Sequence, residues 1–132
     1  MLGNFSIDHM VLTVKSIKDA KDFYVSVLGM KYEEFYADST NELRSCLKFG
    51  SQKINLHQKD NLIYPGAKNP TTGSADICLI SDVDIKEWLA IFKKFNIDIV
   101  NGPVNQVGAE KDLYSIYVRD PDLNLVEISN YK

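Results

Sequence analysis

Four side chains that could do chemistry lie within apolar, strand-like segments of this sequence. They are His9, His57, Asp76 and Glu127, in the segments 7–14, 53–58, 75–80 and 124–129. An imidazole and two carboxylates that converge from different strands can chelate a divalent cation, and such a donor set favours Mn, Fe, Ni or Zn over Mg. A cation with open coordination positions could bind two neighbouring oxygen atoms of a small substrate and stabilise the negative charge that develops on them.

The elements that carry these residues are predicted to form one unit twice. The first copy reads as a strand over 7–14, a helix from Ser16 to the stop at Gly29, and strands over 31–36, 43–49 and 53–58. A Pro/Gly-rich connector follows, and the second copy reads as a strand over 75–80, a helix over 85–95, and strands over 97–103, 113–119 and 124–129. Each copy therefore has the order βαβββ.

Two halves of about sixty residues would each be small for a separate core, so we expect one domain over 1–132. Its parts are repeat one at about 5–58, the connector 59–73 and repeat two at about 74–130. The fold class is α+β: the tandem units form a curved, half-open mixed sheet around a pocket, with the helices outside.

Strand parity predicts which side chains face that pocket, because successive side chains of a strand point to opposite faces of a sheet. In the last strand Val126 and Ile128 go to the helix side, which leaves Glu127 on the concave side. The same rule places further candidates on the concave side: His9, Asn55, His57, Asp76, and a fringe of Arg44, Lys48 and Tyr117. We expect His9, Asp76 and Glu127 to bind the metal, His57 and Glu127 to be catalytic, and Asn55, Arg44, Lys48 and Tyr117 to contact substrate.

Each of these residues also has a structural interpretation. An inward Glu127 needs a partner whether or not a metal is present, and that partner could be a protonated His9 or Lys48. Asp76 could bond backbone N–H groups of the turn 71–74, and His57 could be a surface residue. Arg44 and Lys48 could form a solvated strand face. Trp88 fits helix packing or a dimer contact.

Composition narrows the partners and the compartment. The formal charge of −3 over 132 residues gives no electrostatic reason to expect nucleic acid or an anionic membrane, so a small molecule or a protein is the expected partner. Cys46 and Cys78 have no metal-ligand spacing and are interpreted as reduced, buried thiols. Because the N-terminal residues do not read as a signal peptide and no apolar run is long enough to span a bilayer, we expect a cytoplasmic protein.

Several segments resemble the vicinal oxygen chelate superfamily, which comprises glyoxalases, bleomycin-resistance proteins and extradiol dioxygenases. They are IDHMVLTV at 7–14, FYVSVLGM at 23–30, QKINLHQ at 52–58, NPTTGSADICL at 69–79 and RDPDLNLVEISNY at 119–131. The resemblance covers nearly the whole chain. Within the superfamily it is strongest to glyoxalase domain-containing protein 5 and its bacterial relatives.

The resemblance implies four pseudo-symmetric ligand positions, which correspond to His9, Asn55, Asp76 and Glu127. His9 and Glu127 fit the pattern of the superfamily. Asp76 stands where many members carry histidine, and Asn55 stands where glyoxalase I enzymes carry glutamate or glutamine, so glyoxalase I activity is in doubt. His57, two residues further along the strand, could replace Asn55 as a ligand or act as a base. Small members are commonly homodimers, which implies a homodimer here.

Three functions follow as hypotheses. The first is a metal-dependent enzyme, of the lyase, isomerase or dioxygenase type, acting on a small substrate with adjacent oxygen atoms. The alternative is a metal-free protein that sequesters a small molecule, as the bleomycin-resistance members do. A fosfomycin-type resistance enzyme is a third, but resemblance to that group implies a histidine in place of Asp76.

The turn at 120–124, where the family usually has glycine at the position of Leu123, is interpreted as structural.

Overall fold

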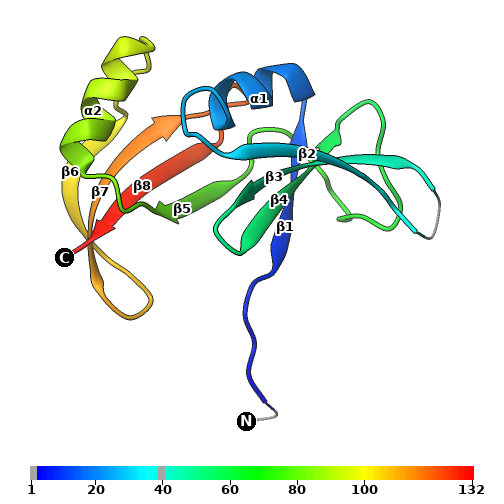
Figure 1. Ribbon diagram of the computed structural model, residues 1–132, viewed down its shortest axis with the longest axis horizontal. Coiled ribbons are helices and arrows are strands. Elements are labelled where there is room, and N and C mark those ends of the chain that lie inside the picture. The colour runs from blue at the N-terminus through cyan, green and yellow to red at the C-terminus, as the bar shows by residue number, and fades with distance from the viewer. Residues whose placement is uncertain (1–2, 39–40) are drawn as a thin grey trace. The chain divides into compact units, whose positions relative to one another are not determined.

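The computed structural model describes residues 3–38 and 41–132, and the chain forms two compact units, residues 1–72 and 73–132 (Figure 1). The N-terminal unit contains β1 (His9–Val14), α1 (Ile17–Tyr24), β2 (Lys31–Tyr36), β3 (Leu43–Phe49) and β4 (Gln52–Gln58). The C-terminal unit contains β5 (Asp76–Ile80), α2 (Ile85–Lys94), β6 (Asn101–Val107), β7 (Asp112–Arg119) and β8 (Leu125–Tyr131). The predicted α+β class and the tandem βαβββ order are confirmed.

Each unit has a four-stranded mixed sheet with the same topology. The order is β1-β4-β3-β2 in the N-terminal unit and β5-β8-β7-β6 in the C-terminal unit. The first strand of each unit runs parallel to the last, and the remaining pairs are antiparallel. The last strand of each unit, β4 or β8, is therefore hydrogen-bonded on both edges and holds its side chains between two neighbours.

The two helices begin where the sequence offers a side-chain cap. The Ser16 hydroxyl accepts a hydrogen bond from the Asp19 amide, and the Asp84 carboxylate accepts one from the Lys86 amide. Helix α1 was predicted to run to the stop at Gly29, but the regular helix ends at Tyr24. The residues after it continue in turns to Gly29, whose positive φ of 83° closes the segment.

Strand β6 was predicted at 97–103 and lies instead at Asn101–Val107. The predicted strand ended at Pro103, whereas the observed strand begins at Asn101 and continues past Pro103. In the structure β6 is an edge strand with a register shift between Asn101 and Val104, and such a position tolerates the missing N–H of Pro103. The register beyond Pro103 pairs Gln106 with Leu113.

The C-terminal core lies between α2 and its sheet, where the helix packs on β7 and β8 (Figure 1). Its fully buried side chains are Ile85, Phe92, Ile116, Val118, Val126 and Ile128. Trp88 is 7% exposed, stacks on Phe92 and donates its indole N–H to the Ser81 hydroxyl at 2.9 Å. Trp88 therefore packs within its own unit, as one of its two predicted roles requires.

The Asp120–Asn124 turn before β8 has the structural role predicted for it. The buried Asp120 carboxylate accepts hydrogen bonds from the backbone amides of Asp122 and Asn124 and from the Asn124 side chain, at 2.8–2.9 Å. The side-chain oxygen of Asn124 in turn accepts from the Ala75 amide at 2.9 Å. The turn thereby ties the start of β8 to the residue that precedes β5.

Leu123 is the strained residue of this turn, and replacing it with glycine is expected to stabilise the protein. Its φ is +71° and its side chain is 66% exposed, so the left-handed backbone costs energy without burial in return. Leu123→Gly should raise the free energy of unfolding by about 0.5–1 kcal/mol, after the entropy that glycine gains in the unfolded chain is deducted. Urea unfolding measures this; Leu43→Gly, at an exposed strand position with ordinary φ, should destabilise. A destabilised Leu123→Gly would contradict the strain assigned to this position.

No helix in the described part of the chain is both long and apolar enough to cross a bilayer.

Candidate functional site

The pairing of β1, β4 and β3 confirms the faces that parity predicts in the N-terminal unit. Val11 pairs with Asn55, Thr13 with His57, and Cys46 with Asn55. His9 precedes Val11 by two residues and so has the same orientation. The apolar partners Leu12, Leu47, Ile54 and Leu56 occupy the other face and are buried. Three of the predicted residues, His9, Asn55 and His57, therefore share one face of this sheet.

The same holds for the C-terminal unit, where Glu127 sits on the central strand β8. Glu127 pairs with Cys78 of β5 on one edge and with Tyr117 of β7 on the other. Asp76 lies on the same face, two residues before Cys78, and is exposed. Parity thus placed Asp76, Tyr117 and Glu127 correctly on one surface.

A chain of hydroxyl groups holds the Glu127 carboxylate. The Ser129 hydroxyl donates to Glu127 Oε2 at 3.2 Å, which leaves Ser115 as the donor in its 2.7 Å hydrogen bond with Ser129. The Cys78 sulfur lies 3.4 Å from the same Ser129 oxygen. Ser115 and Ser129 are both fully buried, so this network fixes the orientation of a half-buried carboxylate from below. The partner that Glu127 needs is thus supplied within its own unit.

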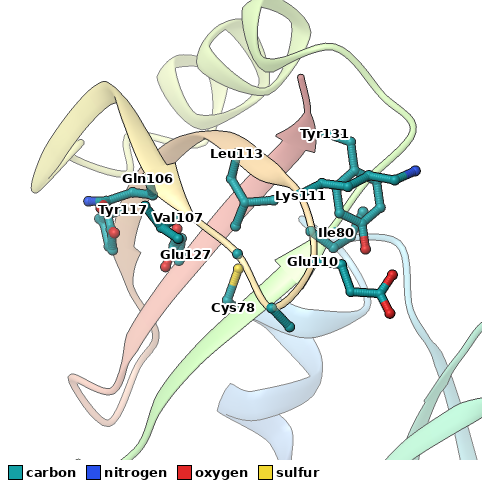
Figure 2. Close-up of a pocket in the computed structure, with 12 residues that line it drawn as sticks. Cys78, Ile80, Gln106, Val107, Glu110, Lys111, Leu113, Tyr117, Glu127 and Tyr131 are labelled. Carbon is teal, nitrogen blue, oxygen red and sulfur yellow. The ribbon is translucent and has the colours of Figure 1, made fainter.

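A cavity with a volume of about 610 Å³ lies over this network and is called the Glu127 cavity below. In Figure 2 Glu127 lies together with Tyr117 and Gln106 on one side of the cavity, and Lys111 and Tyr131 lie on the opposite side. Cys78 and Leu113 lie between the two groups. The Glu127 cavity thus has polar groups on both sides, with apolar side chains such as Leu113 between them, a combination that small-molecule sites commonly have.

Burial and nearby carboxylates raise the pKa of two side chains that line the Glu127 cavity, Tyr117 and Cys78. Burial, followed by the charge of Glu127, raises the pKa of the Tyr117 phenol. Burial also raises the pKa of the Cys78 thiol; the Ser129 hydrogen bond opposes this shift, and Glu127 and Asp76 add to it. Both groups are therefore neutral at pH 7, so Tyr117 can donate a hydrogen bond and Cys78 is a poor nucleophile.

The prediction that both cysteines are buried is wrong for Cys78. Cys46 is 2% exposed, whereas Cys78 counts among the exposed residues and lines the Glu127 cavity. The apolar sequence of β5 predicted burial on both of its faces. In the structure β5 is an edge strand, and the face that carries Cys78 borders the Glu127 cavity. The thiol therefore reports on the charge of Glu127 and can be reached by reagents.

Removal of the Glu127 charge is expected to make Cys78 more reactive. In Glu127→Gln the thiol loses a neighbour that raises its pKa, so a larger thiolate fraction is present at pH 7. Labelling by a small disulfide reagent, followed by mass spectrometry, should become severalfold faster at Cys78. Glu110→Gln is the matched control, because Glu110 lines the same cavity but is not among the groups that shift the pKa of the thiol. Equal rates in the wild type and Glu127→Gln would contradict the coupling.

Three of the predicted residues of the N-terminal unit, His9, Arg44 and Lys48, lie beside acidic side chains, whereas Asn55 has an unpaired oxygen. His9 is exposed and its Nδ1 lies 2.8 Å from Asp8 Oδ1. Arg44 donates to Glu42 at 2.8 Å, and Lys48 lies 3.4 Å from a Glu33 oxygen. The side-chain oxygen of Asn55 is buried and has no hydrogen-bond partner among the described residues. Asn55 is thus a polar group whose partner is still to be supplied.

The donor set suits a divalent cation in chemistry, with carboxylate oxygens from Asp76 and Glu127 and an imidazole nitrogen from His9. Within residues 3–38 and 41–132, however, no three His, Cys, Asp or Glu side chains form a group that could hold one. Asp76 and Glu127 belong to the C-terminal unit and His9 to the N-terminal unit. The metal therefore enters below as a proposal.

Four residues in or beneath the Glu127 cavity were not predicted as site residues: Cys78 and Gln106, which line it, and Ser115 and Ser129, which form the hydroxyl chain to Glu127. Parity did place Cys78 and Ser115 on the concave face, but they carry no charge and attracted no role. Gln106 was hidden by the misplaced β6, and Ser129 counted as the last residue of its strand. The alternation Glu127, Ser129 was the signal available in the sequence for the hydroxyl that holds the carboxylate.

The chain belongs to the Glyoxalase/Bleomycin resistance protein/Dioxygenase superfamily, whose family model matches residues 6–128. It is 46% identical over 125 residues to virulence protein STM3117 of Salmonella typhimurium, an alignment that covers 95% of this chain and 83% of that protein. It is 42% identical over 127 residues to the glyoxalase domain-containing protein RDO1 of Mycosarcoma maydis, covering 96% of this chain and 69% of that protein.

Solved structures share the fold along the whole chain. An integron cassette protein from the mobile metagenome of V. cholerae superposes with a TM-score of 0.91 at 42% identity, covering 100% of this chain and 99% of the other. At lower identity the fold alone is shared. TnmS3, an antibiotic-binding protein from a Streptomyces species, matches over 100% of both chains with a TM-score of 0.75 at 17% identity. A lactoylglutathione lyase from Agrobacterium tumefaciens matches over 95% of this chain and 92% of its own with a TM-score of 0.67 at 23% identity.

Proposed function

We propose that this protein is a divalent-metal-dependent enzyme that acts on a small substrate with adjacent oxygen atoms, of the lyase, isomerase or dioxygenase type. The observation that carries the proposal is the placement of Glu127. Burying a carboxylate on a central strand costs free energy unless a cation or a hydrogen-bond donor interacts with it. Here the hydroxyl groups of Ser129 and Ser115 orient the half-buried Glu127 carboxylate beside a cavity of about 610 Å³. The superfamily supplies the context in which such a carboxylate binds metal.

The proposed roles follow from the chemistry of each side chain. His9, Asp76 and Glu127 would hold the metal, which would act as a Lewis acid toward the substrate oxygens. Tyr117 is a neutral phenol beside Glu127 and would donate a hydrogen bond to a substrate oxygen. Asn55 would use its unpaired side-chain oxygen to accept one.

His57 would act as the general base. Burial, followed by the positive charge of Arg44, lowers its pKa, so the imidazole is neutral and able to accept a proton at pH 7. Arg44 and Lys48 would orient an anionic substrate from the same face of the sheet. Glu127 would serve as both metal ligand and catalytic residue.

Three further points are part of the proposal. A closer kinship with glyoxalase domain-containing protein 5 rests on the sequence segments alone, since the two curated relatives described above are STM3117 and RDO1. A homodimer and a cytoplasmic location are expected from the superfamily and from the composition. TnmS3 shows that the fold also serves antibiotic binding, so sequestration without metal is the competing outcome of the test.

The test is thermal unfolding of chelator-stripped protein titrated with Mn, Fe(II), Ni and Zn. A cation that binds only the folded state should add about 2.7 kcal/mol of stability at a hundredfold excess over its dissociation constant. We expect a selective rise in Tm in the wild type that is lost in Glu127→Ala and in His9→Ala, with Glu110→Ala as the control that keeps it.

A wild-type protein that responds to none of the four metals would refute the metal-dependent enzyme. If a small ligand then bound equally well with and without chelator, sequestration would take its place.

A further inference from the structure

A second cavity lies in the N-terminal unit, where the connector after β4 covers part of the sheet face that carries His57. Its volume is about 460 Å³ and it is called the His57 cavity here. Its floor is formed by Val11, Thr13 and His57, and its wall by residues 62–68 and Pro70. All of these residues belong to one unit, so the cavity exists without a contribution from the other.

Apart from Lys68, the wall of the His57 cavity is formed by apolar residues, several of them exposed. Leu62 is 56% exposed and Tyr64 is 91% exposed, on a connector without regular secondary structure. Pro65 and Pro70 complete a wall of flat, rigid groups. Exposed apolar side chains that gather around a concavity indicate a ligand surface, and tyrosine and proline faces suit a planar ring.

His57 supplies the hydrogen-bonding group at the floor of the cavity. The side chain is half-buried, and neither ring nitrogen has a hydrogen-bond partner among the residues that the structure describes. The register that pairs Ser45 with Leu56 brings Arg44 beside His57 on the same face. The neutral imidazole is therefore free to donate one hydrogen bond to a ligand.

Among the residues that line the His57 cavity, Lys68 carries a charge, and it makes no ion pair with any described residue. Arg44 is close enough to lower the pKa of His57, but its guanidinium is paired with Glu42 at 2.8 Å. No Asp or Glu is among the lining residues, in contrast to the Glu127 cavity, which is lined by Glu110 and Glu127. A ligand with a negatively charged oxygen is thereby favoured over an amine.

We propose that the His57 cavity binds a small aromatic carboxylate, with its ring against Leu62, Tyr64 and the prolines. The carboxylate accepts a hydrogen bond from His57 and is attracted by Lys68. This site shares His57 with the function proposed above, but it needs neither a metal nor the Glu127 cavity. It can therefore be tested in the presence of chelator, where failure of the metal proposal has no influence.

The experiment is an amide NMR titration of the full chain in chelator with benzoate, benzylamine and acetate. Benzoate should shift the amide signals of residues 62–68 other than Pro65, and those of Thr13 and His57, and the shifts should saturate below about 10 mM, as expected for a ligand of its size. Benzylamine lacks the acidic oxygen and acetate lacks the ring, so each should bind at least about tenfold more weakly.

Two variants and a control separate the contributions. His57→Leu keeps the apolar volume but removes the donor, and should weaken benzoate binding about tenfold. Lys68 is exposed, so Lys68→Met should leave the fold intact. It removes the positive charge and should weaken benzoate binding about threefold. Lys59→Met lies on the same connector outside the cavity and should leave the affinity unchanged.

Either of two results would overturn the proposal. One is benzoate binding no tighter than benzylamine, or none up to the solubility limit. The other is an affinity unchanged in both His57→Leu and Lys68→Met.

Discussion

Replacing Asp120 with alanine is expected to lower the free energy of unfolding by about 3–5 kcal/mol, because hydrogen bonds to a charged acceptor are each worth about 1.5–3 kcal/mol. The carboxylate is 3% exposed and accepts from two backbone amides and one side-chain amide. Alanine leaves these buried donors without an acceptor. It also frees Asn124, which holds the Ala75 amide at the start of β5.

Urea unfolding followed by far-UV circular dichroism measures the effect, and Asp122→Ala is the matched control in the same turn. Asp122 contributes its backbone amide to the network, and alanine retains that amide. A loss at Asp120→Ala no larger than at Asp122→Ala would show that the turn does not depend on the buried carboxylate.

Phe92→Ala is expected to be the most damaging change in the core of the C-terminal unit, with a loss of about 3–5 kcal/mol. Phe92 is fully buried and its ring stacks on Trp88 at a centroid distance of 5.7 Å. Its removal leaves a cavity between α2 and the sheet, which the indole cannot fill while Trp88 remains hydrogen-bonded to Ser81.

Phe95, the C-cap residue of the same helix, is the control for loss of a phenyl ring. It is 43% exposed, so Phe95→Ala removes the same atoms with a smaller loss of burial and should cost about 1–1.5 kcal/mol. Trp88 fluorescence during thermal unfolding would report both variants. Equal losses at Phe92 and Phe95 would contradict the packing of α2 described above.

The order of elements could be predicted because each leaves a local signal. Ser16 and Asp84 are side-chain caps, Gly29 ends the α1 segment, and alternation of apolar residues marks β3, β4, β7 and β8. Strand β6 was misplaced by four residues, and its continuation past Pro103 is tolerated because β6 is at the edge of its sheet. The order of strands in a sheet is a tertiary property that no local window contains.

The candidate site could be predicted as a face but not as a set of contacts. Parity fixes the side on which Glu127, Tyr117 and Asp76 lie, because it needs only the period of the strand. The hydroxyl chain from Ser115 through Ser129 to Glu127 depends on the register between β7 and β8, which parity leaves open. The role of Cys78 was missed for the same reason, since its closeness to Glu127 follows from the register of β5 on β8.

The metal content of the protein tests the central claim most directly. Chelator-stripped wild type and Glu127→Gln would each be equilibrated with Mn, Fe(II), Ni and Zn, freed of unbound metal and analysed by mass spectrometry. The account predicts about one ion of a preferred metal per folded chain in the wild type, and its loss in Glu127→Gln with circular dichroism unchanged. A wild type that retains no metal, or a Glu127→Gln variant that retains as much as the wild type, would contradict it.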